Sequence, residues 1–352
     1  MPGSPPIPGK IWARVPNWVG DAVMITPALR AIRKTHPTAE IILCGEPHLE
    51  DLFESHPSVD RFQSIARYDS GSIKRIRRTL REELPDWAVI FPDSFRAALP
   101  AFLARVPFRV GYSRDPLRKV LLTHSLPPPS GADGRRIPIS MVERYLRISR
   151  YLGCPDDGEE TELVVGNRAR SSLGQRLDLS GLSLNDPLFV MTPGASFGSS
   201  KLWPVEHFAA AADQLSRDLN ATCVITPGPG EEDIAKTVES LMSQPVRTLI
   251  QPTVTLSELV ALLSRSLFLV SNDTGPRHIA VALGTPAITV MGSTDPLHTQ
   301  HLMERQKVLR EDVSCSPCHL KLCPIDHRCM TRLKPERVVA AAKELLGMSK
   351  NL

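Results

Sequence analysis

The stretch S-N-D-T-G-P-R-H-I-A-V-A-L-G-T-P, residues 271–286, follows directly on a short apolar run, Leu267–Val270. An apolar run of this length, with no turn residue inside it, is typical of a buried strand in a parallel sheet. Within the stretch, the small and apolar residues Ile279–Leu283 indicate a helix that ends at Gly284 and Pro286. The chain around residue 271 therefore predicts a strand, a turn and a helix, the repeating unit of an α/β fold.

Polar residues lie between this predicted strand and helix. Asn272, Asp273, Thr274 and Gly275 stand at the carboxyl end of the strand and the amino end of the helix. Open α/β sheets bind ligands at such turns, because free backbone N–H groups and the helix dipole both face an anion there. The alternative is an ordinary helix, with Asp273 or Thr274 as its N-cap.

The length and composition indicate two domains of ordinary globular character. The chain has 352 residues, of which 42% are hydrophobic and 23% are charged. No apolar run approaches the roughly 18–20 residues that span a bilayer. The amino-terminal segment M-P-G-S-P-P-I-P-G-K lacks the apolar core of a signal peptide, so we expect a cytoplasmic protein with a loose tail.

Positive charge is concentrated in the first part of the chain. Residues 1–150 contain 23 Lys or Arg and 15 Asp or Glu, whereas the remaining residues contain 19 and 23. A one-sided basic field suits an anionic partner such as a phosphorylated acceptor, a membrane surface or a nucleic acid. For the basic run 74–81 taken alone, a solvated helix face is the better interpretation.

Strand and helix patterns alternate in two series along the chain. The first series has strands at residues 11–15, 41–44 and 89–91, with helices near 48–56, 72–84, 94–104 and 140–152. The second has strands at 188–191, 222–226, 267–270 and 287–290, with helices at 204–219, 256–264 and 335–346. This alternation predicts parallel sheets with crossover helices, and the Pro/Gly-rich segment 127–134 predicts a loop.

The pattern pauses between Asp156 and Pro187, which places a domain boundary there. We expect one doubly wound domain over residues 1–170 and a second over residues 171–352, facing each other across a cleft. An alternative packs the last helix back on the amino-terminal domain. Neither half contains G-x-G-x-x-G after its first strand or a P-loop motif. The sequence therefore lacks the motifs that would support a dehydrogenase or a P-loop NTPase.

Three further loops at predicted strand ends carry polar residues. In N-W-V-G-D, residues 17–21, Asp21 suits either a helix cap or a general base in a closed cleft. The loop 194–203 combines glycines and serines with Lys201, a residue that suits a pyrophosphate but is commonly a surface lysine. In the loop 228–232, Glu231 suits a ribose contact or simple acid enrichment in a first helical turn.

These loops together resemble a known family. The motifs are P-N-W-V-G-D-A-V-M-I-T-P-A-L at 16–29, P-G-A-S-F-G-S-S-K-L-W-P at 193–204, N-D-T-G-P-R-H-I-A-V-A-L at 272–283, G-S-T-D-P at 292–296 and C-x-x-C-x-x-x-x-C-P at 315–324. In this order they resemble the ADP-heptose:lipopolysaccharide heptosyltransferases of glycosyltransferase family 9, most of all their heptosyltransferase II branch.

The resemblance implies a GT-B architecture, in which two Rossmann-like domains face each other. It implies an inverting transfer that needs no catalytic metal and no cofactor, with ADP-heptose as the donor substrate. Asp21 matches the base that activates the acceptor hydroxyl, and Lys201 matches the catalytic partner of the leaving diphosphate. Asn17 and Trp18 are the acceptor-binding candidates.

The donor site that the resemblance implies lies in the carboxyl-terminal domain. Asp273 matches a contact to the sugar and phosphates together with its neighbours in the turn, His278 supports that turn, and Glu231 matches a contact to the nucleoside. The donor-binding candidates are Ser196, Lys201, Glu231, Asp273, Thr274, Gly275, His278, Thr294 and Asp295.

The resemblance also implies partners and a location. The acceptor is the inner core of lipopolysaccharide, a Kdo/heptose-lipid A, and the enzyme works at the cytoplasmic face of the inner membrane of a Gram-negative bacterium. We expect peripheral contact with that membrane, no nucleic acid and a monomer. Two alternatives stay open: a family 9 transferase that uses another nucleotide sugar, and a non-catalytic nucleic-acid-binding protein.

Four cysteines gather near the carboxyl terminus, namely Cys315, Cys318, Cys323 and Cys329. In a cytoplasmic protein, close cysteines suggest a structural metal more than disulfides. Their spacing is tighter than that of two separated C-x-x-C pairs, and the resembling family shares the pattern. We therefore predict a structural loop without a metal, with zinc as the alternative.

Overall fold

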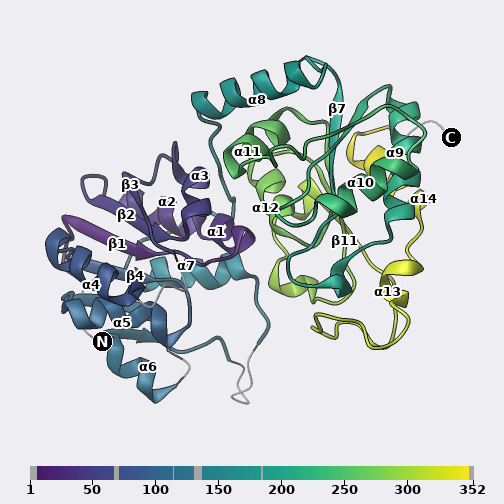
Figure 1. The fold of residues 1–352 in the computed structure, drawn as a ribbon. Helices are drawn as coiled ribbons and strands as arrows, with labels where there is room; N and C mark the ends of the chain where they lie inside the picture. The colour runs from purple at the N-terminus through teal and green to yellow at the C-terminus, as the bar shows by residue number, and fades with distance from the viewer. Residues whose placement is uncertain (1–5, 67–70, 114, 131–136, 184, 349–352) are drawn as a thin grey trace. The chain divides into compact units, whose positions relative to one another are not determined.

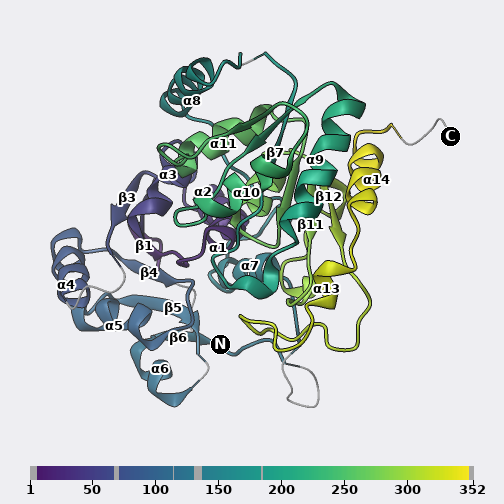
Figure 2. The same ribbon diagram turned by 45° about the vertical axis from the view of Figure 1, so that its right-hand side comes forward.

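The computed structural model describes residues 6–66, 71–113, 115–130, 137–183 and 185–348, so part of the predicted amino-terminal tail (residues 1–5) and of the predicted loop (131–134) lies outside the described residues. The chain divides into two units, shown in Figures 1 and 2. Unit 1 comprises residues 1–164 and 297–301, and unit 2 comprises residues 165–296 and 302–352. The predicted boundary after residue 170 falls inside helix α8 (Asn167–Leu179).

Unit 1 is built on a parallel sheet of six strands in the order β3-β2-β1-β4-β5-β6. This is the strand order of a doubly wound nucleotide-binding fold, in which the chain starts in the middle of the sheet and winds outward twice. The strands are β1 (Lys10–Arg14), β2 (Glu40–Gly45), β3 (Arg61–Ser64), β4 (Trp87–Ile90), β5 (Phe108–Tyr112) and β6 (His124–Leu126).

Helices pack in two groups on this sheet. Helices α1, α2 and α7 contact one another, whereas α4, α5 and α6 form a second series of contacts, and Figure 1 shows the two groups on opposite sides of the strands. Both faces of the central strands are thereby covered, which explains why Ile11, Trp12 and Ala13 are all buried. The helices are α1 (Val19–Met24), α2 (Thr26–Thr35), α3 (Glu50–Phe53), α4 (Ser72–Glu83), α5 (Phe95–Ala104), α6 (Pro116–Leu121) and α7 (Met141–Tyr151), with a 3-10 turn at Pro47–Leu49.

Unit 2 repeats the same topology. Its parallel sheet has the order β12-β11-β10-β7-β8-β9, so its strands, counted within the unit, follow the same sequence as those of unit 1. The doubly wound prediction is therefore confirmed for both halves of the chain. The strands are β7 (Leu188–Thr192), β8 (Thr222–Ile225), β9 (Val246–Thr248), β10 (Leu269–Asn272), β11 (Ala287–Val290) and β12 (Gln306–Leu309).

The helices of unit 2 also form two groups. Helix α9 contacts α10 and α14, whereas α11 contacts α8 and α12. The last helix, α14, packs on α9 and on β12 within unit 2. The helices are α8, α9 (Val205–Leu219), α10 (Glu232–Leu241), α11 (Leu256–Arg265), α12 (Gly275–Ala282), α13 (Arg328–Thr331) and α14 (Pro335–Leu345), with 3-10 turns at Ser199–Lys201, Pro296–His298 and Met303–Arg305.

The stretch at residue 271 forms the predicted strand, turn and helix with shifted bounds. Strand β10 ends at Asn272, two residues beyond the apolar run, because the buried Asn272 side chain finds polar partners within unit 2. Helix α12 begins at Gly275 with Pro276 in its first turn, a position that suits proline. It ends as predicted, with Gly284 at a φ of +76° just beyond its C-cap.

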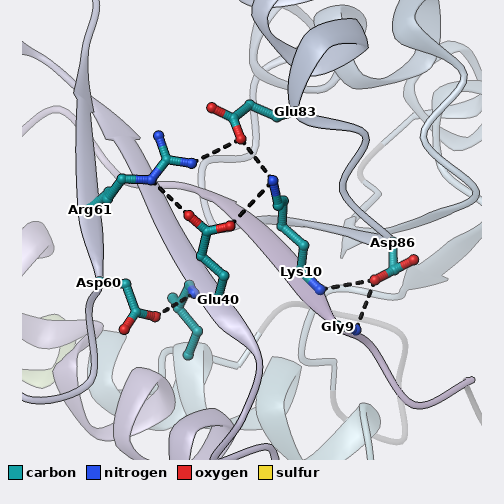
Figure 3. Close-up of polar contacts among 8 residues, drawn as sticks. Gly9, Lys10, Glu40, Asp60, Arg61, Glu83 and Asp86 are labelled. Carbon is teal, nitrogen blue, oxygen red and sulfur yellow. Dashed lines mark hydrogen bonds and ion pairs between the residues drawn. The ribbon is translucent and has the colours of Figure 1, made fainter.

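A network of ion pairs fastens the amino ends of β1 and β2 in unit 1 (Figure 3). Lys10 Nζ lies 2.9 Å from Glu83 and 3.2 Å from Glu40. Arg61 contacts the same two carboxylates, at 2.8 Å from Glu83 and 2.7 Å from Glu40. The network joins three neighbouring strands to the end of α4, and it lies at the opposite end of the sheet from the loops described below.

Two surface features bear on the predicted partners. The basic residues of the 74–81 run lie on α4, where Lys74, Arg75, Arg78 and Arg81 are exposed, as expected for a solvated helix face. Among the described residues, none of the helices combines the length and the apolar character that crossing a membrane requires.

Candidate active site

In each unit, the candidate residues gather where the sheet changes its winding direction. The neighbouring strands at this point are β1 and β4 in unit 1, and β7 and β10 in unit 2. The loops that leave their carboxyl ends diverge and leave a crevice, which is the usual ligand site of such sheets. Asn17, Trp18 and Asp21 follow β1, whereas Lys201 follows β7 and Asp273 follows β10.

Lys201 and Asp273 form a buried ion pair in unit 2. Lys201 Nζ lies 2.7 Å from Asp273 Oδ2 and donates a second bond, 2.8 Å long, to the Asp273 carbonyl. The side chains of Lys201 and Asp273 are 13% and 6% exposed, so Lys201 is not the ordinary surface lysine of the alternative interpretation. Because an ammonium group has three N–H donors, these two bonds leave one for a ligand.

Asp273 is bound on both carboxylate oxygens. Arg277 Nη1 donates to Oδ1 at 3.0 Å, and the Thr294 hydroxyl donates to Oδ2 at 2.6 Å. Burial by itself would raise the pKa of Asp273, but the charges of Lys201 and Arg277 outweigh it and hold this pKa well below its ordinary value. Asp273 is therefore ionised in the folded protein, and it fixes Lys201 in place.

The helix-cap alternative for this turn is right about the position of the cap but not about its hydrogen bond. The N-cap of α12 is Thr274, and its side chain makes no cap hydrogen bond to the helix. Its hydroxyl donates instead to the Asn272 carbonyl at 3.3 Å. Both carboxylate oxygens of Asp273 are bound by other side chains, including Arg277 of α12 itself. Neither Asp273 nor Thr274 therefore makes a side-chain cap bond to the first N–H groups of α12.

Glu231 ends the loop that follows β8, as the N-cap of α10, and lies against the loop that follows β7. Its carboxylate accepts a bond from the Gly228 N–H at 2.9 Å, and burial raises its pKa. It packs so closely on Gly194 that a Cβ atom there would lie 1.7 Å from Glu231 Oε2. Only glycine at position 194 leaves room for the carboxylate, which brings Glu231 to the loop that carries Lys201.

The other donor candidates line the same edge of unit 2 to different degrees. Gly275 opens α12 and His278, one turn later, is 4% exposed. Ser196 is exposed on the loop after β7, and Asp295 is partly buried next to Thr294. Thr294 is thus in contact with Asp273.

The loop with Lys201 rests on the cysteine-rich segment. The Ser200 N–H donates to the Lys321 carbonyl at 3.1 Å, and His327 Nε2 donates to the Ser200 carbonyl at 2.9 Å. Gly198 has a φ of +151°, and a Cβ atom there would meet the Lys321 carbonyl oxygen at 2.3 Å. The position of Lys201 therefore depends on residues far along the chain.

The four cysteines near the carboxyl terminus line one cavity of about 80 Å³. Cys329 is buried, and its pKa is raised by burial and by the neighbouring thiols. Even so, within residues 6–66, 71–113, 115–130, 137–183 and 185–348 the structure forms no group of three or more side chains arranged to hold a metal ion. The zinc alternative therefore has no ligand set in the described part of the chain.

Unit 1 holds a cavity of about 520 Å³ at its own change of winding direction. Asn17, Trp18 and Asp21 line it. Asp21 is the third residue of α1, whose N-cap is Trp18, so the cap interpretation of Asp21 is wrong. Trp18 is 56% exposed, which leaves its indole open to a ligand.

Tyr145 is the partner of Asp21. Its hydroxyl lies 3.1 Å from Asp21 Oδ1, on helix α7, which packs on α1 and α2. Burial and the nearby Asp21 charge raise the pKa of Tyr145 well above its ordinary value. The phenol is therefore neutral, and its O–H donates a hydrogen bond to the carboxylate.

Sequence analysis did not identify several residues that hold the site together. Arg277 lies one helical turn after Asp273 within the N-D-T-G-P-R-H motif, and this spacing could have revealed it. Asn272 donates to the Pro193 carbonyl at 2.7 Å and accepts from the Trp203 N–H at 3.0 Å, so it fixes the Lys201 loop against β10. Tyr145 is 124 positions from Asp21, and nothing local connects the two.

A second ion pair lines the unit 1 cavity. Arg144 Nη2 lies 2.5 Å from Asp93 Oδ2, and the Arg144 guanidinium stacks on the Tyr112 ring at 4.0 Å. Both charged side chains line the cavity, Asp93 from the loop after β4 and Arg144 from α7. They add polar groups opposite the apolar lining, as is common in ligand pockets.

Comparison with known proteins places the chain in a family. The family model described as glycosyltransferase family 9 (heptosyltransferase) matches residues 73–328. The lipooligosaccharide heptosyltransferase 2 of Campylobacter jejuni serotype O:2 is 26% identical over 97% of this chain and 99% of that protein. The lipopolysaccharide heptosyltransferase 2 of Salmonella typhimurium is 28% identical over 86% of this chain and 88% of that protein.

A solved structure agrees with these relatives. The ADP-heptose lipopolysaccharide heptosyltransferase II of Escherichia coli matches with a TM-score of 0.79 and 25% identity, over 97% of this chain and 100% of that one. The predicted α/β fold of the GT-B class is thereby confirmed. The prediction of a glycosyltransferase is also confirmed, against the alternative of a non-catalytic nucleic-acid-binding protein. The chain belongs to glycosyltransferase family 9 (heptosyltransferase).

Proposed function

We propose that the protein is an inverting heptosyltransferase that moves heptose from ADP-L-glycero-D-manno-heptose to the inner core of lipopolysaccharide. Support comes from the relatives, which are named heptosyltransferase 2, and from the name of the E. coli structure, which includes ADP-heptose. In this proposal, residues 1–170 bind the acceptor and residues 171–352 bind the donor. The enzyme works as a monomer at the cytoplasmic face of the inner membrane.

The observation that carries the proposal is the place of Asp21. A carboxylate in a cavity of about 520 Å³, held by a neutral tyrosine, suits a general base that receives a sugar hydroxyl. The cavity volume lies in the range of about 300–1,000 Å³ that small-ligand sites occupy. Asn17 and the exposed Trp18 ring supply polar and apolar contacts for a sugar at the same place.

The reaction is a single displacement at the anomeric carbon of the donor. Asp21 takes the proton of the acceptor hydroxyl while the acceptor oxygen forms its bond to the anomeric carbon. The bond from that carbon to the diphosphate oxygen breaks, and ADP leaves with the bonding electron pair. Because the acceptor enters opposite the leaving group, the anomeric configuration inverts.

Unit 2 supplies the charge that this leaving group needs. The third N–H of Lys201 and the first N–H groups of α12, at Thr274 and Gly275, suit the oxygens of a diphosphate. Glu231 suits a nucleoside hydroxyl, because its carboxylate is partly buried and accepts a single backbone bond. These protein cations and dipoles stabilise ADP without a catalytic metal in the proposed mechanism.

The test is transfer from ADP-heptose by the wild type and by Asp21→Asn. The substitution keeps the shape of the side chain but removes the base, so we expect turnover to fall about 10²–10⁴-fold while ADP affinity changes little. Glu54→Gln, an exposed site in unit 1, is the matched control. Equal losses of ADP affinity and turnover would show that Asp21 is structural.

The donor assignment has its own test. A family 9 transferase for another nucleotide sugar would bind a different nucleotide, so ADP, UDP and GDP should be compared by calorimetry. We expect ADP to bind most tightly. Tight UDP binding with no ADP binding would overturn the heptose donor and favour the alternative.

A further inference from the structure

A second cavity of about 300 Å³ lies beside the Asp21 cavity in unit 1. Asn17, Pro92 and Asp93 line both cavities, so they form a shared wall. The remaining lining comes from the end of β1, from Ile65 and Ala66 just after β3, and from the amino ends of α4 and α5. The two cavities are thus neighbours that meet at Asn17.

Arg14 is the charged group at the bottom of this second cavity. It is 8% exposed, and toward the described residues it uses two of its five N–H donors, one to the Cys44 carbonyl at 2.7 Å and one to Asn17 Oδ1 at 3.0 Å. No carboxylate of the described residues lies within ion-pair distance of Arg14. Burying a positive charge without a counter-ion is costly, and a bound anion would offset that cost.

Other charged side chains lie in or behind the wall of this cavity, and two of them are arginines. Arg96 lies at the rim, is exposed and makes no ion pair with a described residue. Asp93 also lines the cavity, but its Oδ2 is paired with Arg144. The fully buried Arg118 donates to the Pro92 carbonyl at 2.7 Å and so places a further positive charge behind the shared wall.

Two helix ends add to this positive field. The lining residue Ser72 begins α4, and Ser94 is the N-cap of α5, which has ten residues. The amino ends of both helices carry partial positive charge, which adds to that of the nearby arginines. The buried Arg14 gives this field a fixed hydrogen-bond donor, which a helix end alone would lack.

We propose that this cavity binds an anionic group of the acceptor, a phosphate ester or a sugar carboxylate, while the reacting hydroxyl lies at Asp21. The inference rests on the proposed function, because it assigns the second cavity to the same acceptor. Asn17 connects the two subsites, since it lines both cavities and accepts a bond from Arg14. Arg14 and Arg96 then select acceptors by the charge that the acceptor carries, not by the identity of its sugar.

The test uses Arg14→Gln and Arg96→Gln, with Arg81→Gln as the matched control. Arg81 is an exposed arginine of α4 that lines neither cavity. Binding of an inner-core oligosaccharide is measured by calorimetry without donor, in three forms: intact, phosphatase-treated and carboxyl-reduced. ADP affinity is measured alongside, because unit 2 should be unaffected by changes in unit 1.

We expect Arg14→Gln to weaken binding of the intact oligosaccharide about 10-fold and Arg96→Gln about threefold, with Arg81→Gln unchanged. The chemical form that loses affinity for the wild type identifies the anion as phosphate or carboxylate. In the presence of donor, KM for the acceptor should rise by the same factors while kcat changes little. Arg96→Gln keeps the test valid if Arg14→Gln does not fold, because Arg96 is exposed.

Equal affinity of all three oligosaccharides for the wild type would overturn the inference, as would wild-type affinity in both variants. Failure of the proposed function looks different. In that case the wild type transfers nothing from ADP-heptose, yet the difference between intact and treated oligosaccharides persists in the binding measurement and still depends on Arg14.

Discussion

The Tyr145 hydroxyl donates a hydrogen bond of 3.1 Å to Asp21 Oδ1, and so joins helix α7 to the start of helix α1. The bond favours the ionised carboxylate, which is the form that can accept a proton. It also fixes the direction in which the second oxygen of Asp21 points. The base of the proposed reaction is therefore held by a residue that lies 124 positions later in the chain.

Tyr145→Phe removes this hydrogen bond and leaves the ring in place. We expect kcat to fall about threefold to 10-fold at neutral pH, and the acid limb of the kcat profile to move to higher pH, because the ionised base has lost a donor. The measurement is a pH series of initial rates at saturating donor and acceptor. Tyr151→Phe, at the exposed end of the same helix, is the control. An unmoved acid limb would mean that Tyr145 only packs.

Lys201→Ala and Asp273→Asn should separate binding from stability. Lys201→Ala removes the cation for the diphosphate, so we expect ADP affinity to fall about 10-fold. Asp273→Asn removes the counter-ion of the fully buried Arg277, so it should also lower the free energy of unfolding by about 3–5 kcal/mol. Calorimetry with ADP and urea unfolding give the two quantities.

The control for these two variants is Lys236→Ala, an exposed lysine of α10. It should leave both ADP affinity and unfolding unchanged. An Asp273→Asn variant as stable as the wild type would contradict this prediction. It would mean that the buried Arg277 does not need Asp273 as its counter-ion.

Gly194→Ala tests the place of Glu231. The new methyl group would overlap the Glu231 carboxylate, so the glutamate must move away from the Lys201 loop. We expect weaker ADP binding with little change in circular dichroism, and a similar loss for Glu231→Gln. Gly9→Ala is the control, because its Cβ atom would have an ordinary contact of 3.6 Å. Wild-type ADP affinity in Gly194→Ala would remove Glu231 from the donor site.

Glu83→Gln tests the ion-pair network of Figure 3 by its pH dependence. Bonds from Arg61 and Lys10 lower the pKa of Glu83 to about 2, below its ordinary value of 4.5. Its stabilising contribution is therefore complete above pH 4.5 and is lost as the pH falls towards 2. Since these groups are partly exposed, we expect the variant to lose only about 1 kcal/mol at pH 7.

The measurement is urea unfolding of wild type and Glu83→Gln at several pH values. The difference between their midpoints should shrink as the pH falls from 5 to 3. Glu54→Gln, which is exposed and outside the network, should follow the wild type throughout. A difference that does not change with pH would mean that the lost interaction is not an ionic one.

The predicted strands are mainly apolar in sequence, and the strands that were missed show the limit of that criterion. The strands β3, β6, β9 and β12 were not predicted, and all four are sheet edges, where one side of the strand is open and polar residues are tolerated. In β5, Arg109 and Gly111 interrupt the apolar run. Buried parallel strands can thus be identified locally, whereas edge strands are defined by their neighbours.

The candidate site divides in a similar way. Asp273 and Lys201 are found from their loops, because strand ends and helix starts are marked in the sequence. Their contact, across 72 positions of the chain, is not marked at all. Tyr145, Arg144 and Arg14 were missed, because each meets its partner only after the sheet has formed. Local patterns therefore identify the loops of such a site but not the side chains that hold them.

The support of the Lys201 loop by residues 321 and 327 has a consequence for the order of events on the ribosome. A growing chain has completed β7 and the Lys201 loop more than a hundred residues before Lys321 and His327 are added. Domains fold as they emerge, amino-terminal parts first. Strands β7, β8 and β9 can pair early, whereas β12 is made only shortly before Lys321. The Lys201 loop therefore acquires its support only when synthesis is almost complete, and a chain that ends before residue 321 should lack that support.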